Sequence, residues 1–94
     1  MTPEMKTDLE FAVEVLEGMI ARQQVKVLEL GRKWVPHATD EDLRNAEDFA
    51  VLKDKPIFHF EDGILAGLIA AKTAIATELR VRHPETAPRI EAVA

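Results

Sequence analysis

The chain has 94 residues, 47% hydrophobic and 31% charged, a balance typical of a folded globular protein and far from that of a disordered one. It contains no cysteine, which excludes a disulfide framework, thiolate metal ligands and a cysteine nucleophile. Its net charge of −5 argues against direct nucleic-acid binding, because most nucleic-acid-binding proteins carry excess basic charge.

The length indicates a single helical domain over residues 1–84, followed by an extended or frayed tail over residues 85–94. A domain of this size buries only about 60–65% of the surface that its unfolded chain exposes. The first eight residues lack the basic and apolar segments of an export signal, and the longest apolar run falls far short of the roughly 20 residues of a membrane span. We therefore expect a cytoplasmic protein that does not contact membranes.

The first predicted helix begins at Thr2-Pro3-Glu4, which has the hydroxyl cap, early proline and early acid of a helix start. It ends near Trp34 or Val35, because Pro36 cannot continue it. Such a helix is about 48 Å long, so the molecule should be elongated. The alternative is a break at Gly18 or Gly31, which would give a compact bundle of shorter helices.

Two further helices follow. Thr39-Asp40-Glu41-Asp42 predicts a capping box and a short helix that ends near Leu52. Asp54-Lys55-Pro56 predicts the start of a third helix, which ends near His83 because Pro84 follows. Gly63 and Gly67 inside this third helix indicate either dense helix packing or the close approach of another backbone or a ligand.

The first helix carries an apolar residue at alternating spacings of four and three, a pattern that requires partner helices. We therefore predict an all-α fold, a long antiparallel helical hairpin with a short connecting helix, which dimerises into a four-helix-bundle-like core. Gln23 interrupts the pattern and either sets the register of the interface or is partly exposed. The predicted oligomer interface consists of Leu9, Val13, Leu16, Ile20, Gln23, Val27 and Leu30.

One end of the predicted hairpin collects most of the aromatic side chains together with two histidines and two acids. A pocket lined by aromatics with a few polar groups is typical of a ligand site, although aromatics also close the open end of a small bundle. The candidate ligand-binding residues are Trp34, His37, Phe58, His59, Phe60, Glu61 and Asp62.

The sequence offers little for metal binding or covalent catalysis. His59 and Asp62 lie three residues apart and could share a helix face, but neither His-Glu-x-x-His nor Glu-x-x-His occurs. Serine, cysteine and tyrosine are all absent, so hydrolase triads are excluded. We predict no metal, no cofactor and no catalytic residue.

Arg22, Lys33 eleven residues later, Asp42 and Arg44 faintly resemble the pattern of the small helical chorismate mutases, which are intertwined helical dimers. The resemblance covers only the first half of the chain and implies an isomerase whose cationic side chains hold a dicarboxylate. The chain departs from that pattern, since no arginine precedes Arg22 and the third predicted helix contains no glutamine.

The sequence contains a long apolar helix face that favours association, but no catalytic motif. It therefore favours a small, non-enzymatic interaction or scaffold protein that acts as a homodimer or higher homo-oligomer and could engage a protein partner. The alternative is a helical dimer that binds a small molecule or metal at the loop end, including the isomerase just described.

Overall fold

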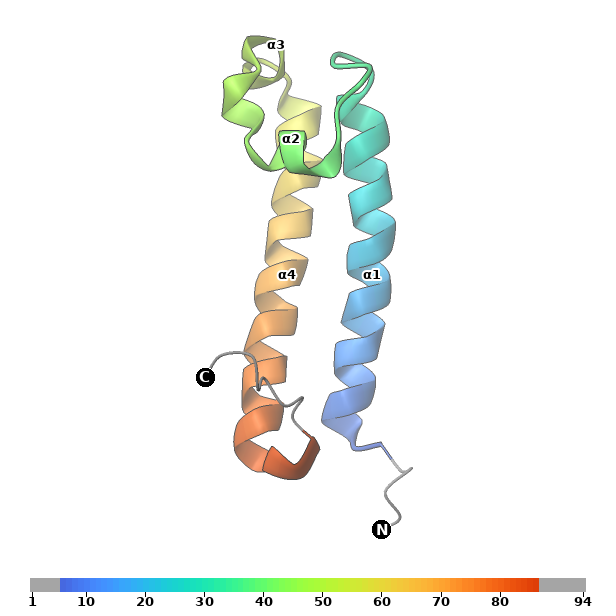
Figure 1. Ribbon diagram of the computed structural model, residues 1–94, viewed down its shortest axis with the longest axis vertical. Helices are drawn as coiled ribbons and strands as arrows, with labels where there is room; N and C mark the ends of the chain where they lie inside the picture. The colour runs from blue at the N-terminus through green and yellow to red at the C-terminus, as the bar shows by residue number, and fades with distance from the viewer. Residues whose placement is uncertain (1–5, 87–94) are drawn as a thin grey trace.

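The computed structural model describes residues 6–86 and shows two long antiparallel helices joined at one end by a short helical connection (Figure 1). The elements are α1 (Asp8–Gly31), α2 (Asp40–Arg44), the 3-10 turn η1 (Ala46–Asp48), α3 (Ala50–Lys53), α4 (Pro56–Arg82) and the 3-10 turn η2 (Pro84–Thr86). No strand occurs in the described part of the chain. The radius of gyration is 16.9 Å, above the roughly 13 Å of a compact domain of this length. The predicted all-helical, elongated hairpin is thus confirmed.

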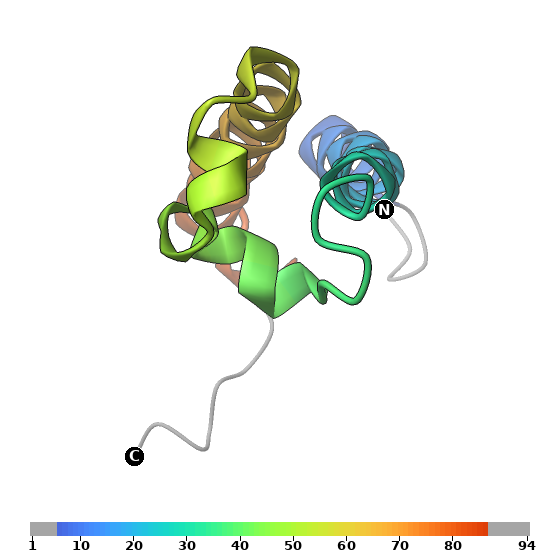
Figure 2. The same ribbon diagram turned by 90° about the horizontal axis from the view of Figure 1, so that it is seen from above.

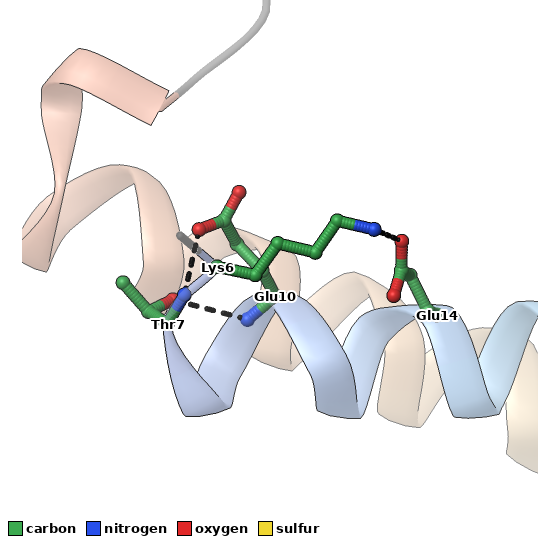
Figure 3. Close-up of polar contacts among 4 residues, drawn as sticks. All are labelled: Lys6, Thr7, Glu10 and Glu14. Atoms are coloured by element: carbon green, nitrogen blue, oxygen red, sulfur yellow. Dashed lines mark hydrogen bonds and ion pairs between the residues drawn. The ribbon is translucent and has the colours of Figure 1, made fainter. Parts of the chain in front are cut away.

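Helix α1 begins later than predicted, because a complete capping box lies at Thr7. The Thr7 hydroxyl accepts a hydrogen bond from the Glu10 backbone N–H at 3.2 Å, and the Glu10 carboxylate accepts one from the Thr7 N–H at 2.9 Å (Figure 3). Lys6 pairs with Glu14 beside this cap (Figure 3). The predicted start at Thr2 lies outside the described residues, but non-helical residues precede Asp8, so no continuous helix runs from Thr2. Thr2 has methionine at the third following position, which cannot complete a capping box.

The end of α1 at Gly31 also differs from the predicted end near Trp34. Helix α1 passes through Gly18 without a break but stops where the connection crosses it. A Cβ atom built on Gly31 would lie 2.7 Å from Cδ1 of Leu43 and 3.3 Å from the Phe58 ring. The turn that follows is held by Arg32, whose Nε donates to the Ala38 carbonyl at 2.8 Å. The end of α1 thus coincides with the close approach of α2 and precedes Pro36.

The connection contains the predicted cap but not the predicted single helix to Leu52. Thr39 and Asp42 form the expected capping box. Asn45 (φ −113°, ψ 50°) and Phe49 (φ −110°, ψ 102°) then leave helical geometry and divide the segment into α2, η1 and α3. In one straight helix Leu43 and Leu52 would point in opposite directions, whereas the two bends let both reach the core.

Helix α4 begins at Pro56 and ends at Arg82, as predicted. Packing within one chain does not explain the two glycines of α4, since a Cβ atom at Gly63 or Gly67 would meet nothing within 4 Å. Of the predicted tail, residues 84–86 form η2, and residues 87–94 lie outside the described residues.

The buried core occupies only the connected end of the hairpin. Leu52 and Phe58 have no exposed surface, and the other buried apolar residues are Val27, Leu30, Ala38, Leu43 and Ala46. The connection lies on one side of the plane that contains α1 and α4 and covers the seam between them there (Figure 2). Among the described residues, none before Val27 and none after Glu61 is buried. Two helices without a third covering element leave their arms half exposed.

The two glycines of α1 should respond oppositely to alanine. Gly31→Ala must displace the buried Leu43 side chain, and overpacking of this kind costs about 1–3 kcal/mol. Gly18→Ala places its Cβ 3.4 Å from the flexible Arg22 side chain and should stabilise the helix by about 0.5–1 kcal/mol. Urea unfolding followed by circular dichroism measures both changes, and a stabilised Gly31→Ala protein would contradict the close packing of α2 on α1.

Candidate functional site

The aromatic residues predicted to line a ligand site have structural roles or face solvent. Phe58 lies in the centre of the core and contacts the His59 ring edge to face, with centroids 5.8 Å apart. Trp34 packs against the core while the Lys55 ammonium lies 5.4 Å from its ring centroid, a cation–π contact. Phe60 is 67% exposed. Phe58 and Trp34 thus pack at the connected end while Phe60 faces solvent, and none of the three rings lines a groove described below.

The two predicted histidines do not meet at one acid, although His59 lies near enough to Asp62 to influence its pKa. His37 is exposed in the turn after α1, and the His59 Nε2 atom lies 3.1 Å from the Lys53 carbonyl oxygen. Within residues 6–86, no three histidine, aspartate or glutamate side chains lie close enough together to hold a metal ion.

No described helix is long and apolar enough to cross a membrane.

Glu61 forms a polar link between the two long helices. Its carboxylate accepts a hydrogen bond from the Gln23 amide at 2.8 Å and pairs with the Lys26 ammonium at 3.0 Å, and the same Gln23 amide also donates to the Glu61 carbonyl. Glu61 is 8% exposed, and these two donors hold its pKa below the usual value despite desolvation. Gln23, predicted to set the register of an interface, thus sets the register of α1 against α4 within one chain.

The other predicted interface residues also lie along the α1–α4 seam. Val27 and Leu30 are buried in the chain's own core, so their burial requires no second copy. Leu9, Val13, Leu16 and Ile20 are half-buried, because α4 covers only one side of them. A second copy could therefore complete the burial of the arm residues but not of Val27 or Leu30.

Asp62 points to the side of the hairpin opposite to the Glu61 link, since successive helical residues lie about 100° apart. There it borders a groove of about 420 Å³ beneath α2. This connector-side groove is lined by Gln24, Val27, Asp40, Leu43, Arg44, Asp62, Leu65, Ala66 and Ile69. Its floor is apolar and its rim carries four polar side chains, an arrangement that suits a small-molecule site.

The polar rim of the connector-side groove is unpaired in the described part of the chain. No hydrogen bond or ion pair joins the side chains of Gln24, Asp40, Arg44 or Asp62 to other described residues. Partial burial raises the pKa of the Asp62 carboxyl, and the nearby His59 opposes that shift only in part. Asp62 is the only member of the predicted ligand set in this groove. Asp40, Arg44 and Gln24 were missed because the bend after α1, which brings α2 over the seam, has no local signature.

The opposite side of the hairpin, which we call the open face, has two shallower depressions of about 260 and 290 Å³ that meet at Lys26. The open face is lined by Met19, Arg22, Gln23, Lys26, Glu29, Leu30, Lys33, Ile57, Glu61, Ile64 and Leu68. Apart from Lys33, in the turn directly after α1, no residue of the connection lines these depressions. Several large apolar side chains are therefore left in contact with solvent.

The residues that resemble the chorismate mutase pattern do not share one surface of the chain. Arg22 and Lys33 line the open face, whereas Arg44 lines the connector-side groove. The Asp42 carboxylate accepts the Thr39 N–H and serves as a helix cap. Within one chain, then, these four side chains do not form a cationic site for a dicarboxylate.

Neutralising the adjacent acids should change stability in opposite directions. The lowered pKa of Glu61 means that its carboxylate stabilises the fold above about pH 4.5 and loses this effect as the pH falls further. The raised pKa of Asp62 means the reverse: its ionised form lowers stability at neutral pH, and this cost disappears as the pH falls toward 3.8. At pH 7, Glu61→Gln should lower and Asp62→Asn should raise the urea midpoint, with both differences shrinking at pH 3.

Asp54→Asn, at an exposed carboxyl, is the control and should leave the midpoint nearly unchanged. A lower midpoint for Asp62→Asn at pH 7 would show that its carboxylate has a stabilising partner.

The geometry thus presents two candidate surfaces, the connector-side groove and the open face. No family model matches this chain, and no curated protein or solved structure matches it either.

Proposed function

We propose that the protein is a non-enzymatic interaction or scaffold protein that acts as a homodimer, in which the open faces of two hairpins pack together into a four-helix bundle. The observation that carries this proposal is the position of the core, which stops at Val27 and Glu61 and leaves residues 8–26 of α1 and 62–82 of α4 without a buried side chain. A second hairpin is the simplest element that covers both arms at once.

The exposed apolar side chains support the open face as the interface. On α4, Ile57 is 57% exposed, Phe60 67% and Ile64 38%. On α1, Met19 is 39% exposed, and Val15 and Phe11 precede it at intervals of four residues, so they extend the same side of the helix. The connector-side surface of α1 instead carries the acids Glu10, Glu14 and Glu17, which favour solvent.

The open face has the size of a stable interface. The side of α4 that bears the open face continues from Ile57 to Leu79, about 33 Å at 1.5 Å per residue, and two helices side by side are about 20 Å wide. The projected area is on the order of 700 Å², close to the roughly 800 Å² per partner of a standard interface.

Two isoleucines of α4 provide a matched test. Ile64 lines the open face at 38% exposure, and Ile69 lines the connector-side groove at 43%. Light scattering should give twice the 10.5 kDa chain mass for the unmodified protein and for Ile69→Lys. Ile64→Lys should weaken the dimer at least tenfold, because a buried lysine without a partner costs more than about 1.4 kcal/mol.

Circular dichroism of each variant verifies that the helices are retained. A monomeric unmodified protein, or an Ile64→Lys dimer as tight as the unmodified one, would overturn the proposal. A loss of the dimer in Ile69→Lys alone would move the interface to the other side of the hairpin.

A further inference from the structure

We propose that the connector-side groove binds a small amphipathic cation, an organic amine whose apolar body lies on the groove floor and whose ammonium group pairs with the Asp62 carboxylate. This site goes beyond the proposed dimer and does not depend on it, because one chain supplies all of its lining and the open face lies on the other side of the hairpin.

The shape of the groove supports a small ligand rather than a partner helix. Its volume of about 420 Å³ falls within the range of about 300–1,000 Å³ found for small-molecule sites. Three separate elements border it, since α1 contributes Val27, α2 contributes Leu43 and α4 contributes Leu65. Helix α2 lies over the seam near the connected end of the hairpin (Figure 1), and its residues Asp40, Leu43 and Arg44 border the groove there.

The charges at the rim select a cation. Asp40, Arg44 and Asp62 together carry a net charge of −1 when all three are ionised. Asp40 and Arg44 lie four residues apart on α2, a spacing at which opposite charges partly compensate each other. The uncompensated charge is therefore that of Asp62. His59, one turn earlier on α4, is the nearest competing cation when protonated, but its Nε2 atom is directed to the Lys53 carbonyl.

Asp62 lacks the hydrogen-bond and ion-pair partners that the neighbouring Glu61 has within the chain. Glu61 accepts from Gln23 and Lys26 and is fully satisfied within the chain. Asp62 makes no such bond to any described residue, and its partial burial raises its pKa, so its ionised form is disfavoured in the empty groove. An ammonium group in the groove would supply the missing partner and favour the ionised form. A charged side chain that lowers stability and borders a cavity is typical of a functional site.

Three probes with the same apolar body test the charge preference: 2-phenylethylamine, 2-phenylethanol and 3-phenylpropanoate. Titration of the ¹⁵N-labelled full chain at pH 7 should give saturable amide shifts with the amine at Leu43, Ala66 and Ile69. The alcohol should bind about tenfold more weakly, equivalent to about 1.4 kcal/mol for the lost charged pair, and the carboxylate more weakly still.

Asp62→Asn is the decisive variant and should lower the affinity for the amine about tenfold, to that of the alcohol, without changing the affinity for the alcohol. It is expected to fold, since it removes a destabilising charge. Asp54→Asn, at an exposed carboxyl, is the matched control and should bind the amine normally.

The proposal is overturned by equal binding of the amine and the alcohol, by amine binding that survives in Asp62→Asn, by shifts centred on the open face, or by the absence of saturation up to about 10 mM. Repeating the titration with Ile64→Lys separates the two proposals, because loss of the dimer should leave amine binding intact.

Discussion

Two antiparallel helices can enclose a core only where a third element covers the seam between them, and this constraint accounts for the distribution of burial in the molecule. The connection folds back over one side of the hairpin and places Leu43, Ala46 and Leu52 against Phe58. Beyond its reach, the arms of α1 and α4 have no second layer, and their apolar side chains are half exposed. The same constraint explains why a second hairpin is the natural complement of this chain.

The polar link from Gln23 and Lys26 to Glu61 complements the apolar core. Apolar packing along a helical seam tolerates a shift of register more readily than a hydrogen bond does, because the latter requires one donor at one acceptor. The link lies at the boundary between the enclosed end and the exposed arms. It therefore fixes the relative position of α1 and α4 at the point where the core no longer does so, and both the connector-side groove and the open face depend on that position.

The two sides of the hairpin then take on different chemistry. On the open face, Glu61 is paired within the chain, and large apolar side chains such as Met19 and Ile64 lie exposed between charged ones, which suits association. In the connector-side groove, Asp62 has no hydrogen-bond or ion-pair partner among the described residues and borders an apolar floor, which suits recognition of a cationic small molecule. The proposed dimer interface and the proposed amine site lie on opposite sides of the hairpin, so dimerisation would not block amine binding.

Local chemistry in the sequence determined the helical class, the capping box at Thr39, the start of α4 at Pro56 and its end before Pro84, since caps and prolines act on their immediate neighbours. It also singled out Gln23 and Asp62, but not Glu61 as the partner of Gln23, nor Asp40 and Arg44 as residues that share a groove with Asp62. Only the tertiary structure decided that α1 ends at Gly31 while the hairpin is kept, that the connection bends at Asn45 and Phe49, and that Glu61 and Asp62 lie on different sides of the hairpin. These features arise from contact between segments distant in the chain, such as Gly31 against Leu43. The apolar periodicity of one helix does not predict them, because it depends only on residues within that helix.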